Sequence, residues 1–327
     1  MTREEPMRSF RSSAHGAILI ALTLVLAACG SGVGDDDGDS GSDGNGGGEP
    51  IASQMILGGP PECPERPFCL PGLEETYGLE FESFQPLDVG GPQTVNALRN
   101  GRIDIGLLFS TSSAIVANDF VVLEDDQGLQ QAENITPVVR EEVLDDTIQS
   151  SLDAVSAALT TDNITELNGR VEIDGEDPGD VAADFIESEG IAPDGSGSGD
   201  LTVGAVAFAE NQIVAEMYAQ VLEEAGYSVD RQIDLRSREI LYPAIESGEV
   251  DIAPEYVGTL VLFLDPEAEG GSDPEAIRSE LEPLLQEDGI ALLESSEAND
   301  TNAFAVTQET ADEFGISSLS DLADPAE

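Results

Sequence analysis

Residues 201–229 read LTVGAVAFAENQIVAEMYAQVLEEAGYSV, and this stretch decides the fold class. A short strand rich in β-branched residues is followed by a helix whose apolar residues recur with helical spacing. Gly226 ends the helix, because glycine adopts the left-handed conformation that closes many helices. A strand and an amphipathic helix open an α/β lobe, yet they stand two-thirds of the way along a chain of 327 residues. We therefore expect an α/β protein of two lobes whose parts come in an unusual order.

An internal repeat places one aromatic residue in each expected lobe. Residues 97–106 read ALRNGRIDIG, and residues 244–253 read AIESGEVDIA. In each copy a helix ends at a glycine, and a buried strand begins after one further residue. Phe109 and Tyr256 then lie twelve residues after the first alanine of their copies, at the carboxyl ends of strands, where open α/β sheets bind ligands. We predict that these rings face each other across a cleft; two ordinary core residues are the alternative.

Composition excludes several classes of function. The chain has 67 Asp and Glu against 12 Lys and Arg, a net charge of −55. So anionic a surface repels nucleic acid and acidic membranes, which we do not expect as partners. It suits a high-salt habitat, where ions screen self-repulsion, although a lineage bias in amino-acid usage is the alternative. The only histidine, His15, lies near the N-terminus, so a Ser/His/Asp triad, a Cys/His pair and most zinc sites are excluded from the rest of the chain.

The N-terminal segment is typical of an exported lipoprotein. Residues 1–28 carry three arginines and then an apolar run that is shorter than the ~20 residues needed to span a bilayer. LAAC, which ends at Cys29, resembles the cleavage box after which the cysteine is lipidated; a simple anchor or an ordinary cleaved signal is the alternative. Residues 29–50 are polar and rich in glycine and aspartate, so we expect a disordered tether. The protein is therefore expected outside the cytoplasm, held to the membrane only by lipid.

Two cysteines remain after this segment. Cys63 and Cys69 lie in PECPERPFCLPG, a proline-rich loop. An oxidising exterior favours a disulfide between them over two free thiols. Their spacing is not C-x-x-C, so a redox role is not expected.

Several long motifs resemble one family. They are FAENQIVAEMYAQVLEEAGY, SREILYPAIESGEVDIAPEYVGT, LPGLEETYGLEF, ALRNGRIDIGLLFST and PVVREEVL. The pattern resembles the substrate-binding proteins of osmoprotectant ABC importers, the glycine betaine/choline-binding family, over about residues 51–192 and 201–327. The resemblance implies a periplasmic-binding-protein-like fold with two α/β lobes, a hinge and a ligand cleft between the lobes. It also implies a permease and its ATPase as partners.

The order of the halves differs from that of the family, in which the part resembling 201–327 comes first. The chain therefore looks circularly permuted, and residues 193–200 form a Gly/Ser linker between the family's usual termini. A trimmed tandem copy, an error in the gene model and an exchange of halves between two chains are the alternatives. We expect lobe 1 to comprise residues 110–192 plus 201–300, and lobe 2, the split lobe, to comprise residues 51–109 plus 301–327.

The resemblance also implies where a ligand binds. The family holds a quaternary ammonium against aromatic faces, because such a cation has no N–H donor. PEYVGT implies Tyr256 as one ring of this cage and Thr259 as a polar contact, and LLFST implies Phe109 as a ring from the other lobe. Arg66, which precedes LPGL, is implied as the partner of a ligand carboxylate; a surface ion pair is the alternative.

Other positions depart from the family pattern. Asn302 and Glu133 stand where relatives often carry a tyrosine, and Asp300 lies two residues before Asn302. Val206 stands where many relatives carry a lysine, so one contact to a ligand carboxylate is missing. A carboxylate attracts a cation by charge and accepts N–H donors, so choline, glycine betaine and a less methylated amine all stay open as ligands.

Glu210 and Asn211 are weaker ligand candidates. They begin the helix after the first strand of residues 201–229, where the helix dipole alone favours a carboxylate. With no catalytic residue, cofactor or metal expected, we interpret the chain as a binding protein and not an enzyme. It would capture a quaternary-ammonium osmoprotectant by lobe closure and deliver it to a permease. An extracellular amine sensor that is not coupled to transport is the alternative.

Overall fold

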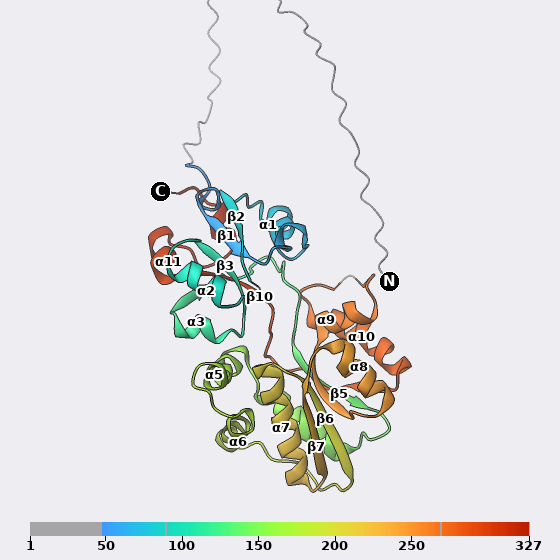
Figure 1. Ribbon diagram of the computed structural model, residues 1–327. Helices are drawn as coiled ribbons and strands as arrows, with labels where there is room; N and C mark the ends of the chain where they lie inside the picture. Colours follow the sequence, from blue (N-terminus) through green and yellow to red (C-terminus); the bar gives the residue numbers. More distant parts are fainter. Residues whose placement is uncertain (1–47, 89, 269, 327) are drawn as a thin grey trace, which may run out of the picture. The chain divides into compact units, whose positions relative to one another are not determined.

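The computed structural model describes residues 48–88, 90–268 and 270–326 (Figure 1). The expected signal segment with His15, the lipidation site Cys29 and the expected tether as far as residue 47 lie outside the described residues. The described part has two mixed five-stranded sheets, each of which forms the centre of one lobe. No helix in it is long and apolar enough to cross a membrane.

Lobe 2 is built on a sheet of strand order β2-β1-β3-β10-β4, in which β10 runs antiparallel to β3 and β4. Its strands are β1 (Ile56–Gly59), β2 (Ser83–Pro86), β3 (Ile105–Phe109), β4 (Phe120–Val122) and β10 (Asn302–Thr307). Its helices are η1 (Ile51–Gln54), η2 (Cys63–Glu65), α1 (Leu70–Tyr77), α2 (Pro92–Arg99), α3 (Ser113–Ala117), α11 (Gln308–Phe314) and η3 (Ser320–Ala323).

Lobe 1 is built on a sheet of strand order β7-β6-β8-β5-β9, in which β5 runs antiparallel to β8 and β9. Its strands are β5 (Ile135–Arg140), β6 (Asp200–Val206), β7 (Ser228–Leu235), β8 (Ile252–Tyr256) and β9 (Ile290–Leu292). Its helices are α4 (Asp146–Ala158), α5 (Thr161–Glu172), α6 (Pro178–Glu189), α7 (Ala209–Ala225), α8 (Arg238–Ser247), α9 (Val257–Leu264) and α10 (Pro274–Glu287).

The two sheets share one topology, which agrees with the sequence repeat. Strands β1, β2 and β3 take the places of β6, β7 and β8, and β10 takes the place of β5. The repeated segments form α2 with β3 and α8 with β8, and Gly101 and Gly248 follow the helices with φ of 62° and 78°. Phe109 and Tyr256 are the last residues of β3 and β8, as the repeat predicts.

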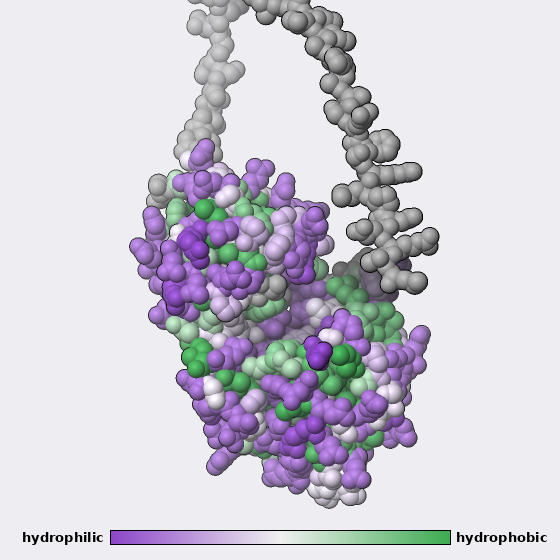
Figure 2. All heavy atoms as spheres, viewed as in Figure 1, coloured by the Kyte–Doolittle hydropathy of each residue, from purple (hydrophilic) through white to green (hydrophobic). Residues whose placement is uncertain are grey.

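Helix α7, the first helix of the stretch that decides the fold class, is buried on nearly all sides. Helices α4, α5 and α6 pack against it, and β6, β7 and β8 also contact it. Ile213, Met217 and Tyr218 on this helix are fully buried, because each faces one of these neighbours. Hydrophilic residues predominate on the face of the described part seen in Figure 2.

The chain crosses between the lobes twice, in residues 130–134 and 299–301, which we call the crossing segments. They pair with each other through an antiparallel bridge between Asn134 and Asn299. The second crossing includes the expected boundary between residues 300 and 301, and the first crossing comes later in the chain than the boundary expected after residue 109. Strand β4 follows that boundary and pairs with β10, so antiparallel pairing keeps residues as far as β4 in lobe 2.

The two ends of the described chain pair with each other in lobe 2. Pro50 and Pro325 form an antiparallel bridge, and the Ala326 amide donates to the Glu49 carbonyl at 3.0 Å. In Figure 1 the blue segment before β1 accordingly lies beside the red C-terminal segment. The last residues of the expected tether, 48–50, therefore belong to the folded lobe.

The linker at residues 193–200 packs on the surface of lobe 1. The Gly197 amide donates to the Ala225 carbonyl at 2.8 Å. A Cβ on Gly197 would lie 1.9 Å from the Tyr227 ring, so only glycine fits there. Asp200, the last residue of the expected linker, is already the first residue of β6.

Candidate functional site

A cavity of about 500 Å³ lies between the lobes, beside the crossing segments. Tyr256 and Thr259 line it from lobe 1, and Phe109 and Arg66 line it from lobe 2. The remaining sequence-predicted ligand residues that line it are Glu133, Asn211, Asp300 and Asn302. Val206, the position without the lysine, contributes an apolar wall. Of the predicted set, Glu210 alone lines a neighbouring cavity instead.

Two aromatic rings stack on the lobe 1 side of the cavity. Phe208 and Tyr256 have ring centroids 6.1 Å apart and an angle of 28° between their planes. Tyr256 is only 9% exposed, and its hydroxyl donates to Glu210 Oε1 at 2.7 Å. Phe208 is 41% exposed and Phe109 is 37% exposed, so both rings offer a free face. The stacked pair and the ring from lobe 2 are suited to a cation with an apolar surface.

Phe208 is a site residue that the sequence reasoning missed. It precedes α7 at the N-cap position, although its side chain makes no cap hydrogen bond. The N-cap position favours Ser, Thr, Asp or Asn, which can cap the helix. A phenylalanine at this position was therefore a sequence signal that its side chain packs against something other than the helix.

The weaker candidates Glu210 and Asn211 support the site. Glu210 is 3% exposed and accepts the Tyr256 hydroxyl and the Asn168 amide. Asn211 accepts the Val206 amide at 2.6 Å and donates to the Pro254 carbonyl at 3.1 Å. These bonds use both ends of the Asn211 side chain to tie β6 to β8. Both residues therefore position groups that line the cavity.

A buried ion pair forms another wall of the cavity. The Arg238 guanidinium meets Glu255 through Nε and Nη2, the shortest contact being 2.7 Å, and Nη2 also donates to Thr259 Oγ1 at 2.9 Å. Glu255 is only 3% exposed, so its charge depends on this partner. The sequence reasoning missed Arg238. A cation in the first turn of a helix, where the dipole disfavours it, was the available signal.

Two carboxylates enter the cavity from the crossing segments. Glu133 is buried, and its Oε2 accepts the Thr259 amide at 2.9 Å. Asp300 is half-buried, and its Oδ1 accepts the Thr111 hydroxyl at 2.7 Å. Burial raises the pKa of Glu133 to about 7, against the hydrogen bonds from Thr259. Burial, and then repulsion from Glu210, raises the pKa of Asp300.

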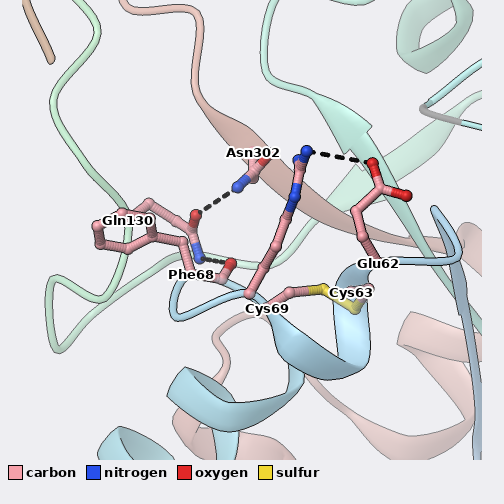
Figure 3. The surroundings of a disulfide bond; sticks show 7 residues. Glu62, Cys63, Phe68, Cys69, Gln130 and Asn302 are labelled. Atoms are coloured by element: carbon pink, nitrogen blue, oxygen red, sulfur yellow. Dashed lines mark hydrogen bonds and ion pairs between the residues drawn. A yellow bond between two sulfur atoms is a disulfide. The ribbon is translucent and has the colours of Figure 1, made fainter. Parts of the chain in front are cut away.

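A disulfide between Cys63 and Cys69 closes the loop that carries Arg66 and Phe68 (Figure 3). Gln130 joins this loop to β10, since its Nε2 donates to the Phe68 carbonyl and its Oε1 accepts the Asn302 amide. Arg66 lines the cavity and also pairs with Glu62 at 3.1 Å. Its side chain is 57% exposed, so this pair is weak. The loop thus offers an arginine at the edge of the cavity.

A second cavity, also about 500 Å³, adjoins the first. The two cavities share Phe109, Phe208 and Asp300. Glu210 and Glu172 bring further negative charge to the second cavity. In the described part of the chain, no group of three or more His, Cys, Asp or Glu residues is arranged to hold a metal ion.

The unliganded protein is expected to lose stability as the pH rises from about 5 to about 8. The folded state raises the pKa of Glu133 to about 7, so its contribution to stability is full below the unfolded pKa and is lost as the pH rises through about 7. At 1.36 kcal/mol per pKa unit, the loss is roughly 2–3 kcal/mol. Glu133→Gln keeps an acceptor for Thr259 but cannot titrate, so it should flatten the slope. Urea unfolding at several pH values measures both proteins, and equal slopes would contradict the assignment.

The family model and the related proteins that match this chain indicate the same family. Residues 49–188 and 199–327 match the OpuAC family model, the substrate binding domain of ABC-type glycine betaine transport system. The glycine betaine-binding protein YehZ of Escherichia coli K12 is 29% identical over 133 residues, which cover 38% of this chain and 44% of that protein. A glycine-betaine-binding protein of Pseudomonas aeruginosa PAO1 is 33% identical over 123 residues, 38% of this chain and 39% of that protein. The chain thus spans less than half the length of these two relatives.

Solved structures of other binding proteins align over most of the chain. The probable amino-acid ABC transporter extracellular-binding protein ytmK of Bacillus subtilis covers 83% of this chain and 89% of its own, with a TM-score of 0.43 and 10% identity. A phosphate-binding protein of Streptococcus pneumoniae TIGR4 covers 83% and 94%, with a TM-score of 0.39 and 11% identity. The family model accounts for both lobes, because its two matched segments leave out only the N-terminal segment and residues 189–198. This chain belongs to the family of substrate-binding domains of ABC-type glycine betaine transport systems.

Proposed function

We propose that the protein captures a small methylated ammonium solute of the glycine betaine and choline class and presents it to the permease of an ABC importer. The observation that carries this proposal is the composition of the cavity between the lobes. Tyr256 and Phe109, one ring from each lobe, both line it, together with the carboxylates of Glu133 and Asp300. Aromatic faces and negative charge together attract an organic cation in a site shielded from water.

Each part of the cavity has a role in this proposal. The faces of Phe208, Tyr256 and Phe109 would pack on the methyl groups of the cation. Arg66, whose pair with Glu62 is exposed, could exchange that partner for a ligand carboxylate. Because the rings belong to different lobes and the crossing segments lie between them, a bound cation favours the closed arrangement over the open one.

Members of this family bind a solute and carry out no reaction, so the expectation of a binding protein and not an enzyme is confirmed. Such domains work outside the cytoplasm in company with a permease. Calorimetry of the purified protein with choline, glycine betaine, carnitine, proline and ectoine tests the proposed ligand class. We expect heat of binding from a compound with an ammonium bearing methyl groups. Binding of proline or ectoine, with none of the others bound, would refute the class.

We also propose that the protein is exported and held to the membrane by lipid on Cys29. The proposal rests on the charged and apolar segments before LAAC and on the polar stretch after it. Cells grown with a labelled fatty acid should transfer the label to the wild-type protein and not to Cys29→Ser. A label that persists in the variant would exclude Cys29 as the modified residue.

We further infer that the halves are in permuted order. The gap between the matched segments, residues 189–198, overlaps the surface linker at residues 193–198, and the opposite ends of the described chain pair at Pro50 and Pro325. In an antiparallel pairing, residues 48 and 326 stand next to each other, so a short loop could join them. Neither site contributes a residue to the lining of the cavity.

Restoring the other order is expected to leave the protein unchanged in fold and in affinity. The variant joins residue 326 to residue 48 through a short glycine-rich loop, starts at Asp200 and ends at Ile191. Closing short loops at the surface changes stability little, so we expect affinity within about threefold of wild type by calorimetry. Opening the chain in a crossing segment, between Ala132 and Glu133, is the control that should abolish binding. Loss of folding in the first variant would contradict the inferred permutation.

A further inference from the structure

The two carboxylates of the cavity stand directly opposite each other. The bridge between Asn134 and Asn299 is flanked by hydrogen bonds from the Asp300 amide to the Glu133 carbonyl, 3.1 Å, and from the Ile135 amide to the Ala298 carbonyl, 3.0 Å. In this antiparallel pattern Glu133 and Asp300 form the next opposing pair, with side chains on the same face. Like charges in such a pair repel each other, unless a cation lies between them.

The charge of Arg238 lowers the pKa of Glu133, but no side chain of the described residues forms an ion pair with either carboxylate. The ion pairs of this part of the chain leave out both Glu133 and Asp300. Arg238 is the arginine on the same wall, and it is engaged with Glu255 and Thr259. Arg238 therefore compensates part of the negative charge at Glu133, and a cationic ligand can compensate the rest.

The carboxylates also keep unused capacity as hydrogen-bond acceptors. Glu133 accepts from the amide and the hydroxyl of Thr259, both at Oε2. Asp300 accepts from the hydroxyl of Thr111 at Oδ1. An ionised carboxylate has about four acceptor positions, so each residue has positions left over. A fully methylated ammonium has no N–H group to donate to these acceptor positions, whereas a less methylated ammonium has at least one.

We propose that the preferred ligand carries at least one N–H on its ammonium group, which donates to Glu133 and Asp300 while its methyl groups pack on Phe208 and Tyr256. This inference rests on the proposed function and narrows its class of methylated ammonium ligands to secondary and tertiary amines. Charge-assisted hydrogen bonds of 2.7–2.9 Å are roughly twice as strong as neutral ones. A quaternary ammonium keeps only the attraction between charges and the contact with the rings.

Calorimetric titration with one methylation series tests the inference. Ethanolamine, N-methylethanolamine, N,N-dimethylethanolamine and choline differ only in their methyl groups, and at about pH 8 all four are cations. At that pH Glu133, with a pKa raised to about 7, is largely ionised, and Asp300, with a pKa raised to about 8, is about half ionised. The monomethyl or dimethyl amine should bind about tenfold more tightly than choline. Choline as the tightest ligand would overturn the inference and leave the proposed function standing. No binding of any of the four, nor of the glycine to glycine betaine series, would overturn both.

Two variants separate a direct contact from a structural role. Glu133→Gln and Asp300→Asn keep the shape and an acceptor but remove the charge. Each should reduce the preference for the dimethyl amine over choline by about fivefold or more, because the lost bond is one that choline never makes. Glu172→Gln is the matched control, since this carboxylate lines the neighbouring cavity and is exposed. The preference of this variant for the dimethyl amine over choline should equal that of wild type. Equal losses for both ligands in Glu133→Gln and in Asp300→Asn would overturn the inference.

Discussion

Arg238→Ala is expected to lower the free energy of unfolding by about 3–5 kcal/mol, the largest effect on stability among the variants considered. Alanine removes the guanidinium that meets Glu255 through two nitrogens and leaves that carboxylate 3% exposed and without its charge partner. The removal of one member of a buried pair costs far more than the pair contributes, because the remaining charge stays desolvated. Urea unfolding followed by circular dichroism measures the loss.

Two controls test this explanation. Arg170→Ala also removes an arginine with two carboxylate partners, but they are 40% and 65% exposed, so a loss within about 1 kcal/mol is expected. Arg238→Met combined with Glu255→Leu removes both charges and should recover most of the stability. Should the double variant be no more stable than Arg238→Ala, the unpaired charge would not be the cause.

Tyr256→Leu is expected to weaken binding of the ammonium ligand by about 30-fold, the effect of losing roughly 2 kcal/mol of cation–π attraction in a desolvated site. Leucine keeps much of the apolar bulk and removes the ring face beside Phe208. Alanine is a poorer choice, because Tyr256 belongs to the core of lobe 1 and truncation of a buried aromatic costs about 3–5 kcal/mol. Calorimetry with the tightest ligand of the methylation series measures the change.

Tyr256→Phe and Tyr218→Leu complete the test. Phenylalanine keeps the ring and loses only the hydrogen bond to Glu210, so most of the affinity should remain. Tyr218 is as deeply buried but does not line the cavity, so Tyr218→Leu should lower stability and leave affinity unchanged. A similar loss of affinity in Tyr218→Leu would show that Tyr256 acts only through the fold.

The sequence alone predicts the features that depend on local pattern. Helix α7 follows from the spacing of its apolar residues, and the positions of Phe109 and Tyr256 follow from the repeat, because each copy encodes a helix, a glycine and a strand. The residues carried over by resemblance come together at one cavity, apart from Glu210. Their roles as ligand contacts stay predictions.

Features that depend on distant partners could not be predicted. Strand β4 has three residues and belongs to lobe 2 only because β10, far along the chain, pairs with it. Arg238 and Glu255 come from a helix and a strand whose side chains meet only after packing. The face-to-face placement of Glu133 and Asp300 likewise depends on how residues 130–134 and 299–301 pair, which no local pattern encodes.

The pairing of Pro50 with Pro325 decides which half of the molecule is fixed when the protein is attached to anything. Both ends of the described chain lie in lobe 2, so attachment to a surface, a bead or an anchor through either end immobilises that lobe. In the other order that we infer for the halves, the ends would leave near Ile191 and Leu201, and lobe 1 would be held instead. The inferred permutation would thus exchange the fixed lobe for the moving one, and with the proposed closure a dye on lobe 1 would report it in immobilised molecules.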